Sequence, residues 1–177
     1  MQRACASFPF ILVVTKHMQR RVSRTLLALS ALLCWNLPVL GDASKICDGA
    51  PNSVGPGATL RWSGSFQPGE GELRVDGLPP HAMGMVLYSY NADNLPFGNG
   101  TLCVGAPPWI MARVRSDAAG QVRLDISAQG EDEDVRWIEF AWRTYGYDTW
   151  YFQHWYRDGA AGGAQHNLSD AIRVSFE

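Results

Sequence analysis

Short apolar segments separated by turn-forming residues are the feature of this sequence that most limits its fold. From residue 58 onward, apolar residues alternate with polar ones or run together briefly, and Gly, Pro, Asn or Asp commonly follows each segment. A period of two residues is typical of β-strands, and no stretch sustains a helical period. The expected strands are residues 58–66, 72–75, 83–90, 101–104, 109–115, 121–126, 135–143, 150–157 and 171–176.

The number and spacing of these segments predict one all-β domain. About eight short strands with frequent turns are typical of an antiparallel β-sandwich of the jelly-roll or immunoglobulin-like (Ig-like) kind. The run at residues 83–90 is almost continuously apolar, as expected of a strand covered on both faces. We therefore assign residues 58–177 to a single β-sandwich that follows an N-terminal loop at residues 42–57. Within the sandwich, residues 91–100 are expected to form a long polar loop, and residues 167–170 a turn before the last strand.

Residues 1–41 predict a secretory signal peptide. An arginine-rich segment at residues 20–24 precedes an apolar stretch at residues 25–35. This stretch is shorter than the roughly 20 residues that a membrane-spanning helix needs, although an uncleaved N-terminal anchor is the alternative. Short residues around the end of the leader favour cleavage after Gly41, with cleavage after Ala43 as the near alternative.

The cysteines predict a disulfide in the exported chain. Cys5 and Cys34 lie in the leader, so cleavage leaves Cys47 and Cys103. An even pair of cysteines in an exported domain indicates a disulfide, because the compartment is oxidising.

The charges are distributed unevenly along the chain. The first 41 positions hold five of the 15 Lys and Arg residues and none of the 17 Asp and Glu residues. The remainder therefore has ten basic and 17 acidic groups, a formal charge of −7. Binding of nucleic acid needs a basic surface that replaces phosphate counterions, so we expect no nucleic-acid partner. We also expect no contact with a membrane apart from the signal peptide.

The sequence contains no recognisable catalytic or metal-binding motif. Its histidines lack the spacing of a zinc site, and it has neither a nucleophile elbow nor a phosphate-binding loop. The acidic run at residues 131–134 is more typical of a solvated loop than of a calcium site. We therefore expect no catalytic residue, no metal and no cofactor. Paired carboxylates drawn from Glu139, Asp148 and Asp158 would be the basis of a small secreted hydrolase, which is the least favoured alternative.

Aromatic residues are concentrated at residues 137–156, where ten of the 20 positions are Trp, Tyr or Phe. Two apolar faces at residues 150–157 indicate a central strand inside the sandwich, so we interpret most of these aromatics as core. The alternative is a platform on which a sugar ring stacks, because exposed aromatic clusters mark binding sites. The candidate ligand-binding residues are Tyr145, Tyr147, Trp150, Trp155 and Arg157.

The neighbouring Arg157 and Asp158 have two interpretations. The guanidinium of Arg157 could stack on an aromatic ring and pair with the carboxylate, as in a ligand site. Alternatively, the two residues form a clamp at a strand end that positions the loop at residues 159–163. We favour the clamp, because Arg is a common partner at packed strand ends.

Three motifs together resemble those of a family of uncharacterised bacterial exported domains. They are Cys47…Pro51-Asn52-Ser53, then Pro96-Phe97-Gly98…Cys103-Val104-Gly105, and then Gln153…Trp155-Tyr156-Arg157-Asp158…Asn167-Leu168-Ser169-Asp170-Ala171. The resemblance covers most of the chain after the leader and implies a β-sandwich-like domain without an established activity. His154 stands where the family usually has an aromatic residue, and His166 stands where it usually has Phe.

Taken together, the sequence predicts an exported, non-catalytic β-sandwich domain with a structural or binding role at the cell surface or in the extracellular medium. The expected partner is an extracellular glycan or another surface protein. The first alternative is a carbohydrate-binding module that uses residues 137–156, and the second is the small secreted hydrolase.

We predict that translation starts at Met18 and that the exported protein begins at Asp42. A complete signal sequence follows Met18, which leaves residues 1–17 without an evident role. Mass spectrometry should find Met18 at the N-terminus of the precursor and Asp42 at that of the exported protein. A precursor that begins at Met1, or an exported protein that retains residues 18–41, would contradict this assignment.

Overall fold

The computed structural model describes residues 41–64, 71–126 and 148–176, and these form an all-β domain, as the sequence predicts. This part of the chain contains ten strands and one short 3-10 helix, and its named strand pairs are antiparallel. The predicted strand at residues 135–143 lies outside the described residues. In the described ranges, no helix is long and apolar enough to cross a membrane.

The largest sheet has five strands in the order β1-β10-β9-β4-β7. The strand β9 lies in its middle, which confirms the prediction that this aromatic segment is a central strand. Both edges of β9 are therefore paired, and Arg157 is the exposed position in its burial pattern. The five strands are β1 (Gly41–Cys47), β4 (Met83–Ser89), β7 (Trp109–Arg115), β9 (Thr149–Arg157) and β10 (His166–Phe176).

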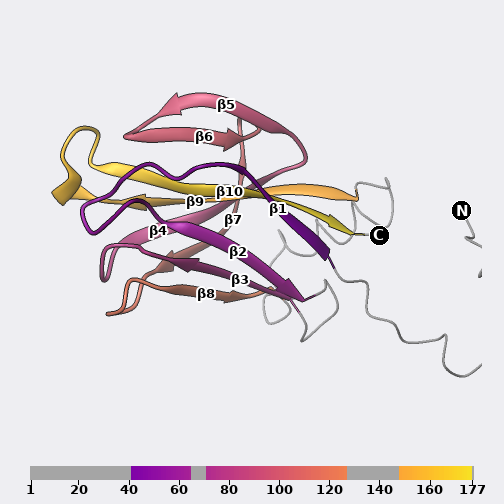
Figure 1. Cartoon of the computed structure of the whole chain (residues 1–177), viewed down its shortest axis with the longest axis horizontal. Helices are drawn as coiled ribbons and strands as arrows, with labels where there is room; N and C mark the ends of the chain where they lie inside the picture. The colour runs from indigo at the N-terminus through magenta and orange to yellow at the C-terminus, as the bar shows by residue number, and fades with distance from the viewer. Residues whose placement is uncertain (1–40, 65–70, 127–147, 177) are drawn as a thin grey trace, which may run out of the picture. The chain divides into compact units, whose positions relative to one another are not determined.

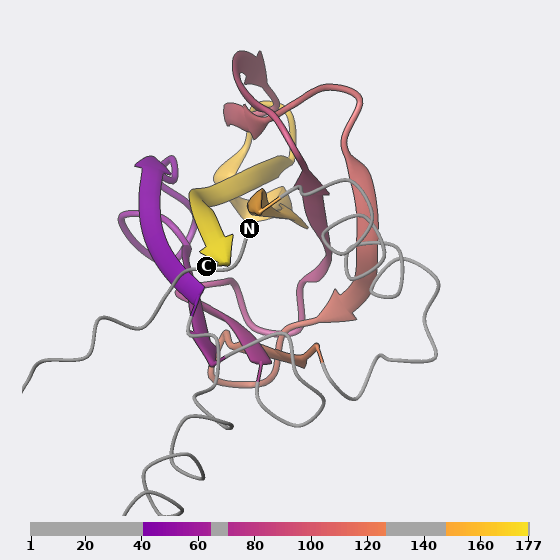
Figure 2. The same ribbon diagram turned by 90° about the vertical axis from the view of Figure 1, so that its right-hand side faces the viewer.

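A three-stranded sheet and a two-stranded hairpin lie on opposite faces of the five-stranded sheet (Figure 1). Figure 2 shows the strands nearly end-on, with β1 and β7 on opposite sides and the three-stranded sheet beneath them. We call the face toward the three-stranded sheet the inner face and the other the outer face. The three-stranded sheet contains β2 (Thr59–Gly64), β3 (Gly71–Asp76) and β8 (Val122–Asp125), and the hairpin contains β5 (Ala92–Phe97) and β6 (Gly100–Val104).

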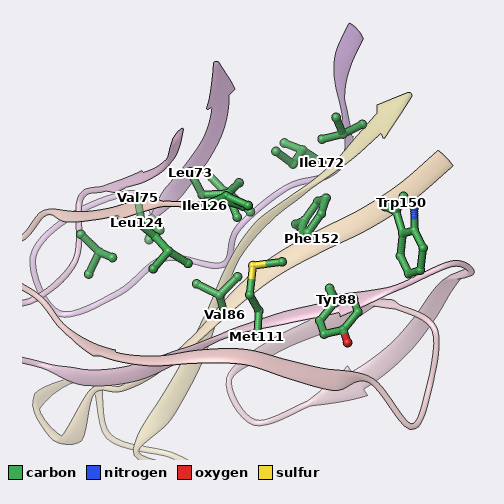
Figure 3. Close-up of a cluster of buried hydrophobic side chains, with 14 of the residues drawn as sticks. Leu73, Val75, Val86, Tyr88, Met111, Leu124, Ile126, Trp150, Phe152 and Ile172 are labelled. Atoms are coloured by element: carbon green, nitrogen blue, oxygen red, sulfur yellow. The ribbon is translucent and has the colours of Figure 1, made fainter. Parts of the chain in front are cut away.

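The main core fills the space between the three-stranded sheet and the inner face. Because alternate residues of a strand point to the same side, each strand contributes every second side chain. Full burial of one large apolar side chain stabilises the fold by roughly 1.5–3 kcal/mol, so this cluster is a major source of stability. Figure 3 shows side chains that meet from the two sheets: Leu73, Val75, Val86, Tyr88, Met111, Leu124, Ile126, Trp150, Phe152 and Ile172.

A second, smaller core lies between the hairpin and the outer face. Leu102 and Val104 of β6 pack there against Leu87 of β4 and Leu168 of β10. The disulfide between Cys47 and Cys103, with an S–S distance of 2.10 Å, joins the hairpin to the end of β1. The predicted disulfide is thereby confirmed.

The buried amide of Gln153 attaches the hairpin to the sheet through two hydrogen bonds to β6 and bonds β10 through a third. Its Oε1 accepts from the backbone N–H of Cys103 at 2.8 Å. Its Nε2 donates to the carbonyls of Thr101 and Ser169, both at 2.9 Å. The side chain is fully buried, so each of these bonds satisfies a polar group that has no access to water.

A β-bulge in β10 connects the five-stranded sheet to β2. The register of β10 and β9 shifts between Leu168 and Ala171, so that Ser169 and Asp170 bulge from the ladder. Ser169 Oγ accepts from the backbone N–H of His154 at 3.0 Å. Asp170 reaches the other sheet, where its Oδ1 accepts from the backbone N–H of Leu60 at 2.5 Å.

Three local predictions are wrong, each for a physical reason. Residues 92–97 of the predicted polar loop form β5, whose residues are all exposed, so burial imposes no alternation on its sequence. The first part of the predicted N-terminal loop at residues 42–57 belongs to β1, a polar edge strand. The predicted turn at residues 167–170 lies within β10, because its Asn, Ser and Asp side chains bond the backbone around the bulge rather than within a turn.

We predict that Gln153→Leu lowers the free energy of unfolding by about 2–5 kcal/mol, because it leaves buried backbone groups of Cys103, Thr101 and Ser169 without partners. Urea denaturation of the oxidised protein measures this change. The matched control is Gln121→Leu at a half-exposed turn position, which should change the free energy by less than about 0.5 kcal/mol. Equal effects of the two substitutions would contradict the role given to Gln153.

Candidate functional site

A groove opens on the outer face beside the hairpin, and we call it the outer groove. Its volume is about 380 Å³, within the range of roughly 300–1,000 Å³ that is typical of pockets for small molecules. Seven of its eight lining residues are apolar, which favours an apolar ligand group. The lining residues are Met85, Leu87, Phe97, Leu102, Pro108, Ile110, Trp155 and His166.

The position of the hairpin explains why the groove exists. The strand β6 contacts β9 and β10 more than β4, so the hairpin covers only part of the outer face. Residues of β4 alternate between the faces, which directs Val86 and Tyr88 to the main core and leaves Met85 and Leu87 on the outer face. The floor of the groove is therefore a regular sheet, and one wall is the hairpin.

Three aromatic rings form one side of the groove. The ring of His166 lies 5.6 Å from that of Trp155 and 5.3 Å from that of Phe97, centroid to centroid. Since a carbonyl only accepts, His166 Nδ1 donates to the carbonyl of Ala164 at 2.9 Å. Gly98, with φ of +63°, lies so close that a Cβ there would be 2.5 Å from His166 Nε2. The bond from Nδ1 to Ala164 and the close approach of Gly98 to Nε2 together fix the orientation of the imidazole.

A second hollow of about 230 Å³ adjoins the outer groove. The two share Trp155 and His166 as lining residues, and the second adds Arg157, Ala164 and Gln165. Arg157 and His166 are partners across the β9–β10 ladder, which brings them to the same face. Among the residues that line the two hollows, Arg157 carries the permanent charge.

Asp158 has a structural role, unlike its neighbour Arg157. It is buried, and its Oδ2 accepts from the backbone N–H of Ser53 at 2.9 Å. Its Oδ1 accepts from the backbone N–H of Ala161 at 3.3 Å, so it caps the 3-10 helix η1 (Gly159–Ala161). The sequence predicts that Arg157 and Asp158 together form a clamp at the strand end. In the structure this description fits Asp158, whereas Arg157 lines the second hollow.

The structure brings together two of the five predicted ligand-binding residues. Trp155 is half-buried and Arg157 is exposed, and both line the second hollow. Trp150 is fully buried on the inner face, so the prediction that it stacks on a ligand is wrong. Tyr145 and Tyr147 lie outside the described residues.

The remaining members of the outer groove were missed by sequence reasoning. Phe97 belongs to one of the sequence motifs, but the polar and turn-forming residues of its segment predict a loop, and all residues of β5 are exposed. His166 lies beside the rings of Trp155 and Phe97, which are distant from it in the sequence, so no local pattern marks it as a groove residue. Leu102 and Ile110 lie in predicted strands, but nothing near them in the sequence marks them as members of a groove, because only folding brings their strands to the same face.

Of the carboxylates considered for a hydrolase, Asp158 is occupied by backbone donors, Asp148 is exposed, and Glu139 lies outside the described residues. Within the described part of the chain, no group of three His, Cys, Asp or Glu residues could hold a metal ion. The acidic run at residues 131–134 is also outside it. No protein-family model, no curated protein and no solved structure matches this chain.

His154 is a buried titratable group on the face of β9 opposite the outer groove. Its ring stacks on that of Tyr156 at 6.0 Å, and neither ring nitrogen has a hydrogen-bond partner among the described residues. Gly84 makes room for it, since a Cβ there would lie 2.5 Å from His154 Nε2. Burial lowers the pKa of His154 from 6.5 to about 3, so the folded protein holds it neutral.

We predict that His154 makes the folded protein sensitive to acid. The unfolded chain binds a proton below its pKa of 6.5, whereas folded His154 resists protonation until about pH 3. Its contribution to stability is therefore complete above pH 6.5 and is lost as the pH falls toward 3, at a cost of about 2 kcal/mol between pH 7 and 5. Urea denaturation across this pH range measures the effect.

The matched variant is His154→Phe, which keeps an aromatic ring and removes the titration. Repacking can shift its stability by a constant amount, but the pH-dependent loss should be smaller than that of the wild type by about 2 kcal/mol between pH 7 and 5. Burial raises the pKa of Asp170, which acts in the opposite direction in both proteins and cancels in the comparison. Parallel stability curves for the two proteins would rule out this role of His154.

Proposed function

We propose that this protein is an exported, non-catalytic β-sandwich domain that acts by binding a ligand in the outer groove. The observation that carries the proposal is a mostly apolar groove, walled by the three rings of Phe97, Trp155 and His166 and adjoined by the guanidinium of Arg157. Concave apolar sites with a few polar groups are typical of ligand pockets.

The support of the groove by regular structure favours a binding role. Met85, Leu87 and Ile110 lie on paired strands, and the hairpin wall is attached by the disulfide and by Gln153. A site whose walls are already fixed in place loses little conformational entropy when a ligand binds. A purely structural domain would not need an exposed apolar hollow of this kind.

Export is part of the proposal and is supported by two features. The sequence has the order of a signal peptide, and the exported part contains a disulfide, which persists in oxidising compartments. The resemblance to bacterial exported domains agrees with this location. The cell surface or the extracellular medium is therefore where the ligand would be met.

Carbohydrate binding is the second candidate function. The half-buried ring of Trp155 offers a stacking surface, and Arg157 and Gln165 offer hydrogen-bond donors beside it. This places a sugar in the second hollow rather than on the aromatic platform expected at residues 137–156. A glycan-array screen of the purified protein tests it, and the apolar lining of the larger hollow favours an apolar ligand group instead.

We predict that an uncharged apolar fluorescent probe such as N-phenyl-1-naphthylamine binds the protein at one site and that Phe97→Ser weakens this binding by about fivefold or more, because the substitution removes a wall of the groove. Fluorescence titration gives the dissociation constant. The matched control is Met83→Ser, since Met83 is 52% exposed, against 45% for Phe97, and lies outside the groove lining.

The two variants are first shown to unfold at wild-type urea concentrations. Equal probe affinity in both, or no probe binding to the wild type, would contradict a binding site in the outer groove.

A further inference from the structure

We propose that the ligand of the outer groove is a single-chain amphiphile with an anionic head group. Its apolar chain lies in the larger hollow, and its head group lies in the second hollow at Arg157. This inference rests on the proposed binding function and names the chemical class of ligand that the two hollows fit together.

The larger hollow fits an unbranched apolar chain. The floor and walls of the larger hollow are aliphatic or aromatic side chains, and its polar lining group is the imidazole of His166. Its Nδ1 is bonded to Ala164, and its Nε2 is buried beside Gly98 without a hydrogen-bond partner among the described residues, out of reach of a ligand. A polar ligand group placed there would lose its bonds to water without replacing them. An apolar chain has no such penalty and gains from leaving water.

The second hollow fits an anion. The planar guanidinium of Arg157 presents several N–H donors in a geometry that matches a carboxylate. The neighbouring carboxylate of Asp158 forms no ion pair with Arg157 among the described residues, and its oxygens accept from the backbone N–H groups of Ser53 and Ala161 instead. Among the described residues, the ion pairs are Lys45–Asp48 and Arg74–Asp76, which leave Arg157 available.

The two hollows meet at the same pair of side chains. Trp155 and His166 line both, so a molecule that fills one enters the other directly. Arg157 follows Trp155 by two residues on the same face of β9, which places the charge immediately beyond the aromatic wall. This order of apolar wall and then cation corresponds to the order of chain and head group in an amphiphile.

The negative net charge of the domain has only a weak effect on the binding of an anionic head group at Arg157. The formal charge of −7 after residue 41 includes the acidic run at residues 131–134, and salt screens exposed charges beyond about 8 Å at physiological ionic strength. The local contact with Arg157 therefore dominates the selection of the head group. Cationic amphiphiles of the same chain length are expected to bind more weakly than anionic ones.

The test is calorimetric titration of the purified protein with two matched ligand series below their micelle concentrations. The first consists of straight-chain carboxylates of increasing length and the second of the corresponding primary alcohols. Affinity should rise by about fourfold for each added methylene until the larger hollow is full, and then level off. At each length, the carboxylate should bind about two- to fivefold more tightly than the alcohol.

Two arginine variants separate this inference from the proposed function. In Arg157→Gln, the carboxylate should bind no more tightly than the alcohol, whereas Arg123→Gln, an exposed arginine of β8 on the other sheet, should keep the wild-type preference. Equal affinity of the two series in the wild type would overturn the anionic head group and leave the groove as a binding site.

No binding by either series would overturn the amphiphile inference and, if the fluorescent probe also fails to bind, the proposed function. The source of the chain is tested with vesicles of phosphatidylcholine and phosphatidylglycerol. Binding to these vesicles without binding to free carboxylates would also overturn the inference, because it would indicate a membrane surface as the ligand.

Discussion

The bulge in β10 is the structural element on which the three layers of the domain depend. At Ser169 and Asp170 the β9–β10 pairing is interrupted, so buried backbone groups of the two strands have no partner in the ladder. Such groups destabilise a fold unless something else bonds them. Gln153 bonds the carbonyl of Ser169 and extends to the hairpin, and Asp170 bonds Leu60 of the three-stranded sheet. One irregularity therefore holds the layers together.

The outer groove is a consequence of how the hairpin is attached. Gln153 and the disulfide attach the hairpin through β6, which places it over β9 and β10 and away from β7. The part of the outer face that the hairpin does not cover still carries apolar side chains, because β4 is an internal strand of the sheet, paired with β9 on one edge and β7 on the other. An apolar hollow bounded by paired strands is the result.

Two of the three sequence motifs, the one around Pro51 and the one from Gln153 to Ala171, meet at one end of the domain. Asn52 donates to Tyr156 Oη at 3.1 Å and Asn167 donates to the carbonyl of Pro51 at 2.8 Å. Together with the bond from the backbone of Ser53 to Asp158, these contacts connect residues about a hundred positions apart. These motif residues are thus structural, whereas Phe97, Trp155 and Arg157 of the same motifs line the two hollows.

The sequence by itself determined the class of fold, most strands and the disulfide. Period-two alternation reflects burial on one face of a strand, so β3, β7 and β8 are predicted from the local sequence. Cys47 and Cys103 are the two cysteines outside the predicted leader, which makes them the predicted pair. It did not reveal β5, whose residues are all exposed, or β1, whose mostly polar sequence lacks an apolar alternation. It also placed Trp150 in a binding site, although alternation within β9 directs that ring into the core.

Only the tertiary structure decided which residues share a site. Trp155 and Arg157 were candidates from the sequence, but Phe97, Leu102 and Ile110 join them through strand order and through the placement of a hairpin over one part of a sheet. Those arrangements come from contacts between distant segments, chiefly the bonds of Gln153 to β6 and β10. No local pattern predicts these contacts, because Gln153 and its partner Cys103 are 50 positions apart in the sequence. The residues around Gln153 would look the same whether or not its amide had a partner.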